Sequence, residues 1–161
     1  MTNSYDLAVI GGGIFGLSVA RSAAKAGLKV ALIEAERIGA GASGGVLGAL
    51  MPHMPARWND KKAFQFQALT SLEGHIRALE AETGSATGYR RCGRVMPVTS
   101  EDKLLHQKLR VEESLTRWQS ADTGLTYKLD DPNTHATWLT PATAPYGVVY
   151  ETLSARGAPP A

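Results

Sequence analysis

A run of glycines near the start of the chain directly follows a short apolar stretch. Leu7–Ile10 has the composition of a strand, and GGGIFG at residues 11–16 leads from it into a segment with helical spacing of apolar residues. A second apolar run, Lys29–Ile33, is expected to form a buried parallel strand, and it ends at the acid Glu34. Strand, glycine turn, helix, strand and terminal acid together predict a dinucleotide-binding βαβ unit.

Each position of the glycine run has a separate physical role in such a unit. Gly11 lets the chain turn sharply off the first strand, and Gly13 lets a pyrophosphate approach the backbone. Gly16 lets the helix pack closely on the sheet. The N–H groups of Ile14 and Phe15 lie in the first helical turn, where unpaired donors and the helix dipole favour an anion.

Glu34 is expected to project from the carboxyl end of the second strand. A carboxylate there accepts hydrogen bonds from the ribose hydroxyls of an adenosine and repels a 2′-phosphate, so NADP is disfavoured. The alternative is a glycine-rich turn in an ordinary parallel sheet. The agreement of the motif with its strand and helix context favours nucleotide binding.

Composition excludes several classes of protein. The 161 residues include 17 Lys and Arg and 15 Asp and Glu, and the basic residues are scattered, so no nucleic-acid partner is predicted. A single cysteine and four widely spaced histidines predict no metal site. The N-terminus lacks a charged leader and no apolar run is long enough for a membrane span, so we expect a cytoplasmic protein.

The pattern changes after Glu34. Residues 35–55 are rich in Gly and Ala, residues 62–82 have the spacing of an amphipathic helix, and Ser100 precedes a second helix. Strand-like segments are expected at residues 89–98, 126–129 and 147–150.

This order predicts an α/β chain with three parts. Residues 1–52 form an incomplete Rossmann-like βαβ segment, residues 53–153 begin an α+β substrate domain, and residues 154–161 form a disordered tail because Gly and Pro break helix and strand alike. Two parallel strands leave an unpaired sheet edge, through which we expect self-association.

The residues also carry a family resemblance. DLAVIGGGIFG at residues 6–16, the acid Glu34 and GASGGVLGA at residues 41–49 resemble the D-amino acid oxidase superfamily of FAD-dependent oxidoreductases, in particular glycine oxidase and sarcosine oxidase. The likeness covers residues 5–153. It implies a Rossmann-like FAD domain built from separated segments with an inserted substrate domain. Since members are about twice this length, the chain is expected to be an N-terminal fragment.

The resemblance implies FAD as cofactor and an amine or amino acid as substrate, oxidised at its C–N bond by hydride transfer to the flavin. It places backbone donors to the pyrophosphate in the glycine run and ribose contacts at Glu34 and Ala35. Ala42 and Ser43 would meet the phosphate and ribityl region, and Gly45, Val46 and Leu47 the isoalloxazine. No catalytic residue is assigned. The motif predicts the cofactor-binding residues Gly11, Gly13, Ile14, Phe15, Gly16 and Glu34, and the resemblance adds Ala35, Ala42, Ser43, Gly45, Val46 and Leu47.

Three alternatives stay open at this stage. An NAD-dependent dehydrogenase is disfavoured by the loop at residues 41–49, because a nicotinamide domain normally continues with a further helix and strand. A tRNA-modifying flavoprotein carries a similar loop before a stretch like GALMP at residues 48–52. A non-catalytic FAD-binding remnant is the third.

Overall fold

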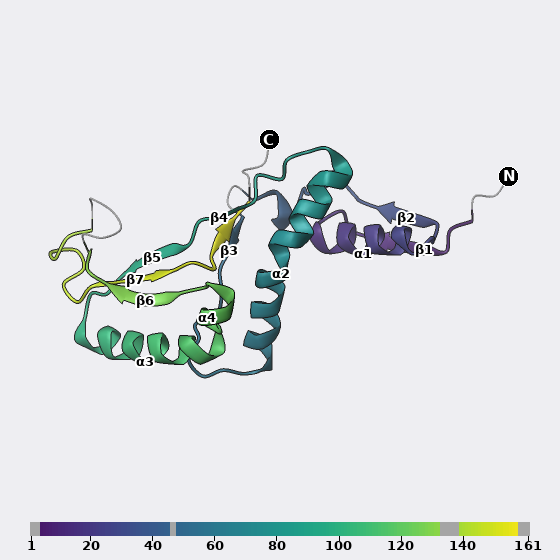
Figure 1. Cartoon of the computed structure of the whole chain (residues 1–161). Helices are drawn as coiled ribbons and strands as arrows, with labels where there is room; N and C mark the ends of the chain where they lie inside the picture. Colours follow the sequence, from purple (N-terminus) through teal and green to yellow (C-terminus); the bar gives the residue numbers. More distant parts are fainter. Residues whose placement is uncertain (1–3, 46–47, 133–138, 158–161) are drawn as a thin grey trace. The chain divides into compact units, whose positions relative to one another are not determined.

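The computed structural model describes residues 4–45, 48–132 and 139–157 (Figure 1). The chain divides between Gly48 and Ala49 into two compact units. We call the described residues up to 48 the N-terminal unit and those from 49 onward the C-terminal unit. This division falls four residues before the boundary expected at residues 52 and 53.

The N-terminal unit is one βαβ element. Strand β1 (Leu7–Ile10) pairs in parallel with β2 (Val30–Ile33), and helix α1 (Ile14–Lys25) connects them. The register places Leu7 opposite Val30 and Ile10 opposite Ile33. A short 3₁₀ turn, η1 (Ala42–Gly44), follows. The predicted parallel pairing is confirmed.

The expected burial of the second strand is wrong. Val30, Ala31 and Leu32 are half-buried, while Ile33 is 54% exposed and Ile10 is 85% exposed. A single helix and a two-stranded sheet cannot cover both faces of the strands, and a parallel strand is buried only when both faces are covered. The described N-terminal unit therefore has almost no core of its own.

The C-terminal unit contains two antiparallel sheets, each of three strands, and two long helices. The strand orders are β3-β8-β4 and β5-β7-β6. The strands are β3 (Ala49–Leu50), β4 (Arg90–Arg91), β5 (Arg94–Pro97), β6 (Tyr127–Asp130), β7 (Val148–Glu151) and β8 (Ala155–Arg156), and the helices are α2 (Asp60–Thr83), α3 (Glu101–Arg117) and the short α4 (Ser120–Thr123).

Side-chain caps start both long helices, and the cap at Ser100 is the one that the sequence predicts. The Asn59 Oδ1 accepts a hydrogen bond from the Lys62 N–H at 3.1 Å, and the Ser100 Oγ accepts one from the Lys103 N–H at 3.4 Å. Helix α2 ends at Gly84, whose φ of 67° is left-handed. The two predicted helices are thus confirmed, because their signals are local.

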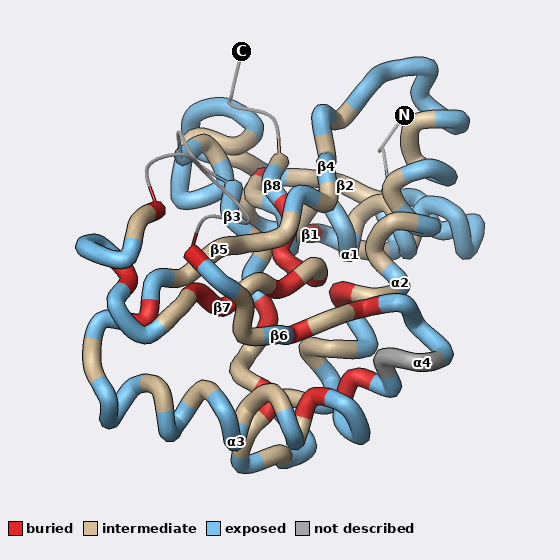
Figure 2. The backbone as a smooth tube through the Cα atoms, turned by 60° about the vertical axis from the view of Figure 1, so that its left-hand side comes forward, coloured by how far each residue is buried: buried red, intermediate tan, exposed pale blue. Residues whose placement is uncertain are grey.

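The core of the C-terminal unit is built around aromatic rings. Trp118 is fully buried, with the Tyr127 ring 5.6 Å and the Phe66 ring 6.1 Å from it, centroid to centroid. Figure 2 shows buried residues gathered on β7, at the start of β6 and near the end of α3. Rings at these separations add to the hydrophobic stabilisation of their burial.

One corner links the two sheets. Glu151 is fully buried, and its carboxylate accepts hydrogen bonds from the Leu153 and Ser154 N–H groups at 2.8 and 2.9 Å and lies 3.3 Å from the Arg94 Nε. Gly93 turns the chain from β4 into β5 with a φ of 68°. A Cβ added there would lie 2.6 Å from the Glu151 carbonyl oxygen, so only glycine fits.

The prediction of a disordered tail is wrong at Ala155 and Arg156. These two residues form β8, which pairs with β3 on one side and β4 on the other. They precede the chain-breaking Gly157, and their backbone groups pair with strands β3 and β4, which are distant in the sequence. Residues 158–161 lie outside the described residues.

We expect Gly93→Ala to destabilise the C-terminal unit by about 1–3 kcal/mol, because the added methyl group meets backbone and the φ is left-handed. Gly74→Ala is the matched control, since no atom lies within 4 Å of its added Cβ in α2. The control should stabilise the unit by up to about 1 kcal/mol. Urea unfolding followed by Trp fluorescence measures both, and equal midpoints would contradict the prediction.

Candidate cofactor site

The turn between β1 and α1 is built by backbone contacts that exclude side chains. Gly11 has a φ of 102°, and its N–H donates to the Ile33 carbonyl oxygen at 2.8 Å. A Cβ on Gly16 would lie 1.9 Å from the Gly11 carbonyl oxygen. The first turn of α1 can therefore sit against the end of β1 only because residue 16 is glycine.

Glu34 connects the end of β2 to this turn. Its Oε2 accepts a hydrogen bond from the Gly12 N–H at 2.5 Å, and its Oε1 accepts one from the Glu36 N–H at 3.0 Å. The Gly39 N–H donates to the Gly12 carbonyl oxygen at 3.0 Å. Each carboxylate oxygen has a second lone pair, so the group retains acceptor capacity for a ribose hydroxyl.

The backbone also determines the charge of Glu34. Hydrogen bonds from the N–H groups of Glu36 and Gly12, and a weaker one from Ala35, lower the pKa of the carboxyl from 4.5 and outweigh the opposing effect of desolvation. The group is therefore ionised at neutral pH. An ionised carboxylate is the form that accepts from two adjacent hydroxyls.

Ser43 occupies the N-terminus of α1. The helix begins after Gly13, which has no side chain to cap it, and the Ile14 N–H donates to the Ser43 Oγ at 2.9 Å. A Cβ on Gly13 would lie 3.2 Å from this oxygen. The fold thus brings the second predicted loop onto the donors of the first, 29 residues away in sequence.

The other predicted residues lie around the same turn. Ala42 begins η1 and Gly45 follows its end. Phe15 lies in the first turn of α1 and is 87% exposed. Val46 and Leu47, predicted beside the isoalloxazine, lie outside the described residues.

Sequence reasoning missed two glycines that hold the second loop. Gly39 has a φ of 74°, and a Cβ on Gly44 would lie 2.2 Å from the Gly39 carbonyl oxygen. Both glycines belong to the run of small residues at 39–45. Their spacing within this run is the sequence signal that could have identified them as structural positions of the loop. They allow Ser43 to reach α1.

These groups fit the adenosine diphosphate end of a dinucleotide. The side chains of Ile14 and Phe15 at the N-terminus of α1 are exposed, and a Cβ at residue 13 would narrow the space beside them. The ionised carboxylate of Glu34 lies at the end of the neighbouring parallel strand. A helix N-terminus attracts a pyrophosphate and the acid a ribose.

Comparison with known proteins defines the class. The family described as FAD dependent oxidoreductase matches residues 6–156, and the chain belongs to this family. FAD is the cofactor of the family, which confirms the predicted cofactor, the predicted family and the partial α/β flavoprotein fold.

Particular relatives match over part of their length. Glycine oxidase of Bacillus licheniformis is 34% identical over 88 residues, which are 55% of this chain and 23% of that protein. The bifunctional protein MnmC of Nitrosospira multiformis, for tRNA 5-methylaminomethyl-2-thiouridine biosynthesis, is 39% identical over 87 residues, 53% of this chain and 14% of that protein. The crystal structure of glycine oxidase from Geobacillus kaustophilus superposes with a TM-score of 0.78 at 21% identity, covering 99% of this chain and 42% of that one.

The described residues show neither a metal centre nor a membrane segment. They contain no group of three or more His, Cys, Asp or Glu side chains arranged to hold a metal ion. None of the helices in this part of the chain is both long and apolar enough to cross a bilayer.

We expect Gly16→Ala to disrupt the β1–α1 turn, because the methyl group would occupy the position of the Gly11 carbonyl oxygen. Hydrogen exchange of the β1 and β2 amides should accelerate at least tenfold. Gly41→Ala is the control in the same unit, with a φ of −81° and no atom within 4 Å of the added Cβ. Retained protection in the Gly16 variant would contradict the close packing.

The carboxyl group of Glu34 should titrate with a pKa below 4.5, and its contribution to the stability of the fold should depend on pH accordingly. Because its pKa is lowered in the folded state, this contribution is present above pH 4.5 and is lost as the pH falls through the folded value. The carboxyl ¹³C shift of Glu34 gives the midpoint, and the amide shifts of Gly12 and Glu36 should change with it. A midpoint at or above 4.5 would refute the two backbone hydrogen bonds.

Proposed function

We propose that the N-terminal unit holds the adenosine diphosphate part of FAD in an enzyme that oxidises an amine or an amino acid at its C–N bond. The observation that carries this proposal is the convergence of Ile14, Ser43 and Glu34 on one glycine turn. The family match over residues 6–156 supports FAD as the dinucleotide. The expected cytoplasmic location remains part of the proposal.

In this proposal the pyrophosphate lies at the N-terminus of α1. The Ile14 N–H turns from the Ser43 Oγ to a phosphate oxygen, the Phe15 N–H donates to the same group, and the freed Ser43 hydroxyl donates to phosphate or ribityl oxygens. Glu34 accepts from the ribose hydroxyls while it keeps the Gly12 N–H. Gly11, Gly13 and Gly16 keep side chains away from the cofactor and from the helix contact.

The remaining contacts follow the family resemblance. We propose that Ala35 contacts the ribose, that Ala42 borders the phosphates, and that Gly45, Val46 and Leu47 lie beside the isoalloxazine. Bound FAD would supply a two-electron hydride acceptor for the oxidation of the substrate's C–N bond. The chain itself binds and orients the cofactor, and no catalytic acid or base is assigned to it.

Glycine oxidation is one candidate activity, because the matched relatives include glycine oxidase at 34% identity. Action on an amine carried by tRNA is the second candidate, favoured by the 39% identity to the MnmC protein. The matched segments span less than a quarter of either relative, so both activities concern the whole enzymes.

A segment exchange tests the role of the N-terminal unit. Residues 4–48 replace the corresponding segment of the Bacillus licheniformis glycine oxidase, and FAD content and glycine oxidation are measured. The chimera should retain stoichiometric FAD and oxidise glycine, whereas Glu34→Gln in the same chimera should bind FAD about tenfold more weakly because charge-assisted hydrogen bonds are lost. A chimera with native far-UV circular dichroism but without FAD would refute the proposal.

The 161-residue chain alone should bind FAD weakly, lose it on gel filtration and show no turnover with glycine, sarcosine or a D-amino acid. Apolar side chains of its sheet and helix are exposed, including Ile10 at 85% and Phe15 at 87%. We also expect self-association through the unpaired edge of its parallel sheet, seen as a concentration-dependent mass in sedimentation. Stoichiometric FAD in a monomer after gel filtration would contradict both expectations.

A further inference from the structure

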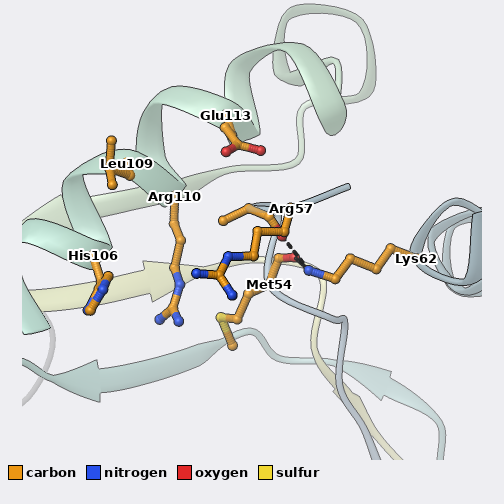
Figure 3. Close-up of a pocket in the computed structure, with 8 residues that line it drawn as sticks. Met54, Arg57, Lys62, His106, Leu109, Arg110 and Glu113 are labelled. Carbon is orange, nitrogen blue, oxygen red and sulfur yellow. Dashed lines mark hydrogen bonds between the residues drawn. The ribbon is translucent and has the colours of Figure 1, made fainter. Parts of the chain in front are cut away.

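The C-terminal unit contains a pocket of about 460 Å³, and four of its eight lining residues are basic (Figure 3). The loop before α2, the first turn of α2 and one side of α3 form it. Arg57, Lys62, His106 and Arg110 contribute basic groups, and Glu113 is the acid among the lining residues. A volume of this size suits a small molecule rather than a single ion.

Within the described part of the chain, no carboxylate forms an ion pair with either guanidinium group. Figure 3 shows Arg57 and Arg110 extending into the same part of the pocket, with the carboxylate of Glu113 apart from both. Like charges directed into one pocket repel each other, and an anion between them would remove that repulsion.

Arg110 has a neutral partner. Burial raises the pKa of Tyr127 above its usual value. Arg110 lies beside the Tyr127 hydroxyl, and its charge and its hydrogen bond partly oppose this increase in pKa. The same hydroxyl donates to the Gln107 Oε1 at 2.6 Å. Because burial keeps Tyr127 uncharged, the positive charge of Arg110 remains available to a ligand.

Lys62 holds the loop that carries Arg57. Its Nζ donates to the Met54 carbonyl oxygen at 3.0 Å and also to that of Ala56. The next residue, Arg57, has a φ of 54°, a left-handed value that is uncommon for a residue with a side chain. Strained backbone of this kind is concentrated at functional sites, where it fixes the direction of a side chain.

We propose that this pocket binds a small organic dicarboxylate. Arg57 and Arg110 present planar donor pairs that match a carboxylate, while Met54 and Leu109 contact the carbon chain. The formal charges of Arg57, Lys62, Arg110 and Glu113 sum to +2, which two carboxylates balance. All the lining residues belong to the C-terminal unit, and the proposal does not depend on the proposed cofactor function.

Calorimetric titration of the 161-residue chain with succinate tests the proposal. Arg57→Gln and Arg110→Gln should each weaken binding at least tenfold, because each removes a charge-assisted hydrogen-bond pair. Arg117→Gln is the matched control, because Arg117 is exposed, lies at the end of the helix that carries Arg110, and does not line the pocket. The control should bind within twofold of the parent chain.

The uncharged diamide succinamide should not bind, and inorganic phosphate should bind more weakly than succinate. Binding of phosphate without succinate, or equal affinities of the arginine variants and the control, would overturn the proposal. Absence of succinate binding by the parent chain would do the same. If Arg110→Gln alters the Trp118 fluorescence and so the fold, the exposed Arg57→Gln decides the outcome.

Discussion

The close approach of backbone segments around the first glycine turn is the constraint on which the cofactor site depends. The Gly11 carbonyl oxygen occupies the space where a side chain of residue 16 would lie, and the Glu34 carboxylate reaches back to the Gly12 N–H. These contacts join the end of β1, the start of α1 and the end of β2. They align the helix dipole with an ionised acid at one edge of the sheet.

The two units have different sources of stability. The C-terminal unit buries an aromatic cluster around Trp118 and a satisfied carboxylate at Glu151. The N-terminal unit buries Val9 and leaves Ile10 and Phe15 exposed. Because the N-terminal unit has so small a core, a bound nucleotide would contribute to its stability. A ligand that binds only the folded state shifts the folding equilibrium toward that state.

Local sequence signals predicted the helices and strands. The predictions that were wrong concern features that depend on contacts between residues far apart in the sequence. Asn59 and Ser100 each start a helix by accepting a hydrogen bond from a residue three positions away, and the sequence predicts the cap at Ser100. The pairing of Ala155 with Leu50 joins residues about a hundred positions apart, and the exposure of Ile33 depends on which elements cover the sheet. Likewise, Arg57 and Arg110 share a pocket that no spacing indicates.

The sequence by itself determined the class of ligand, because the glycine turn and terminal acid are local chemistry that only a few backbone geometries accommodate. It also carried the family resemblance that the FAD dependent oxidoreductase match confirmed. Tertiary structure alone decided that Ser43 caps the helix at Ile14 and that two distant arginines face one pocket. Both arrangements join segments that are far apart in the sequence. The local sequence around each residue does not specify which distant segment folding will bring next to it.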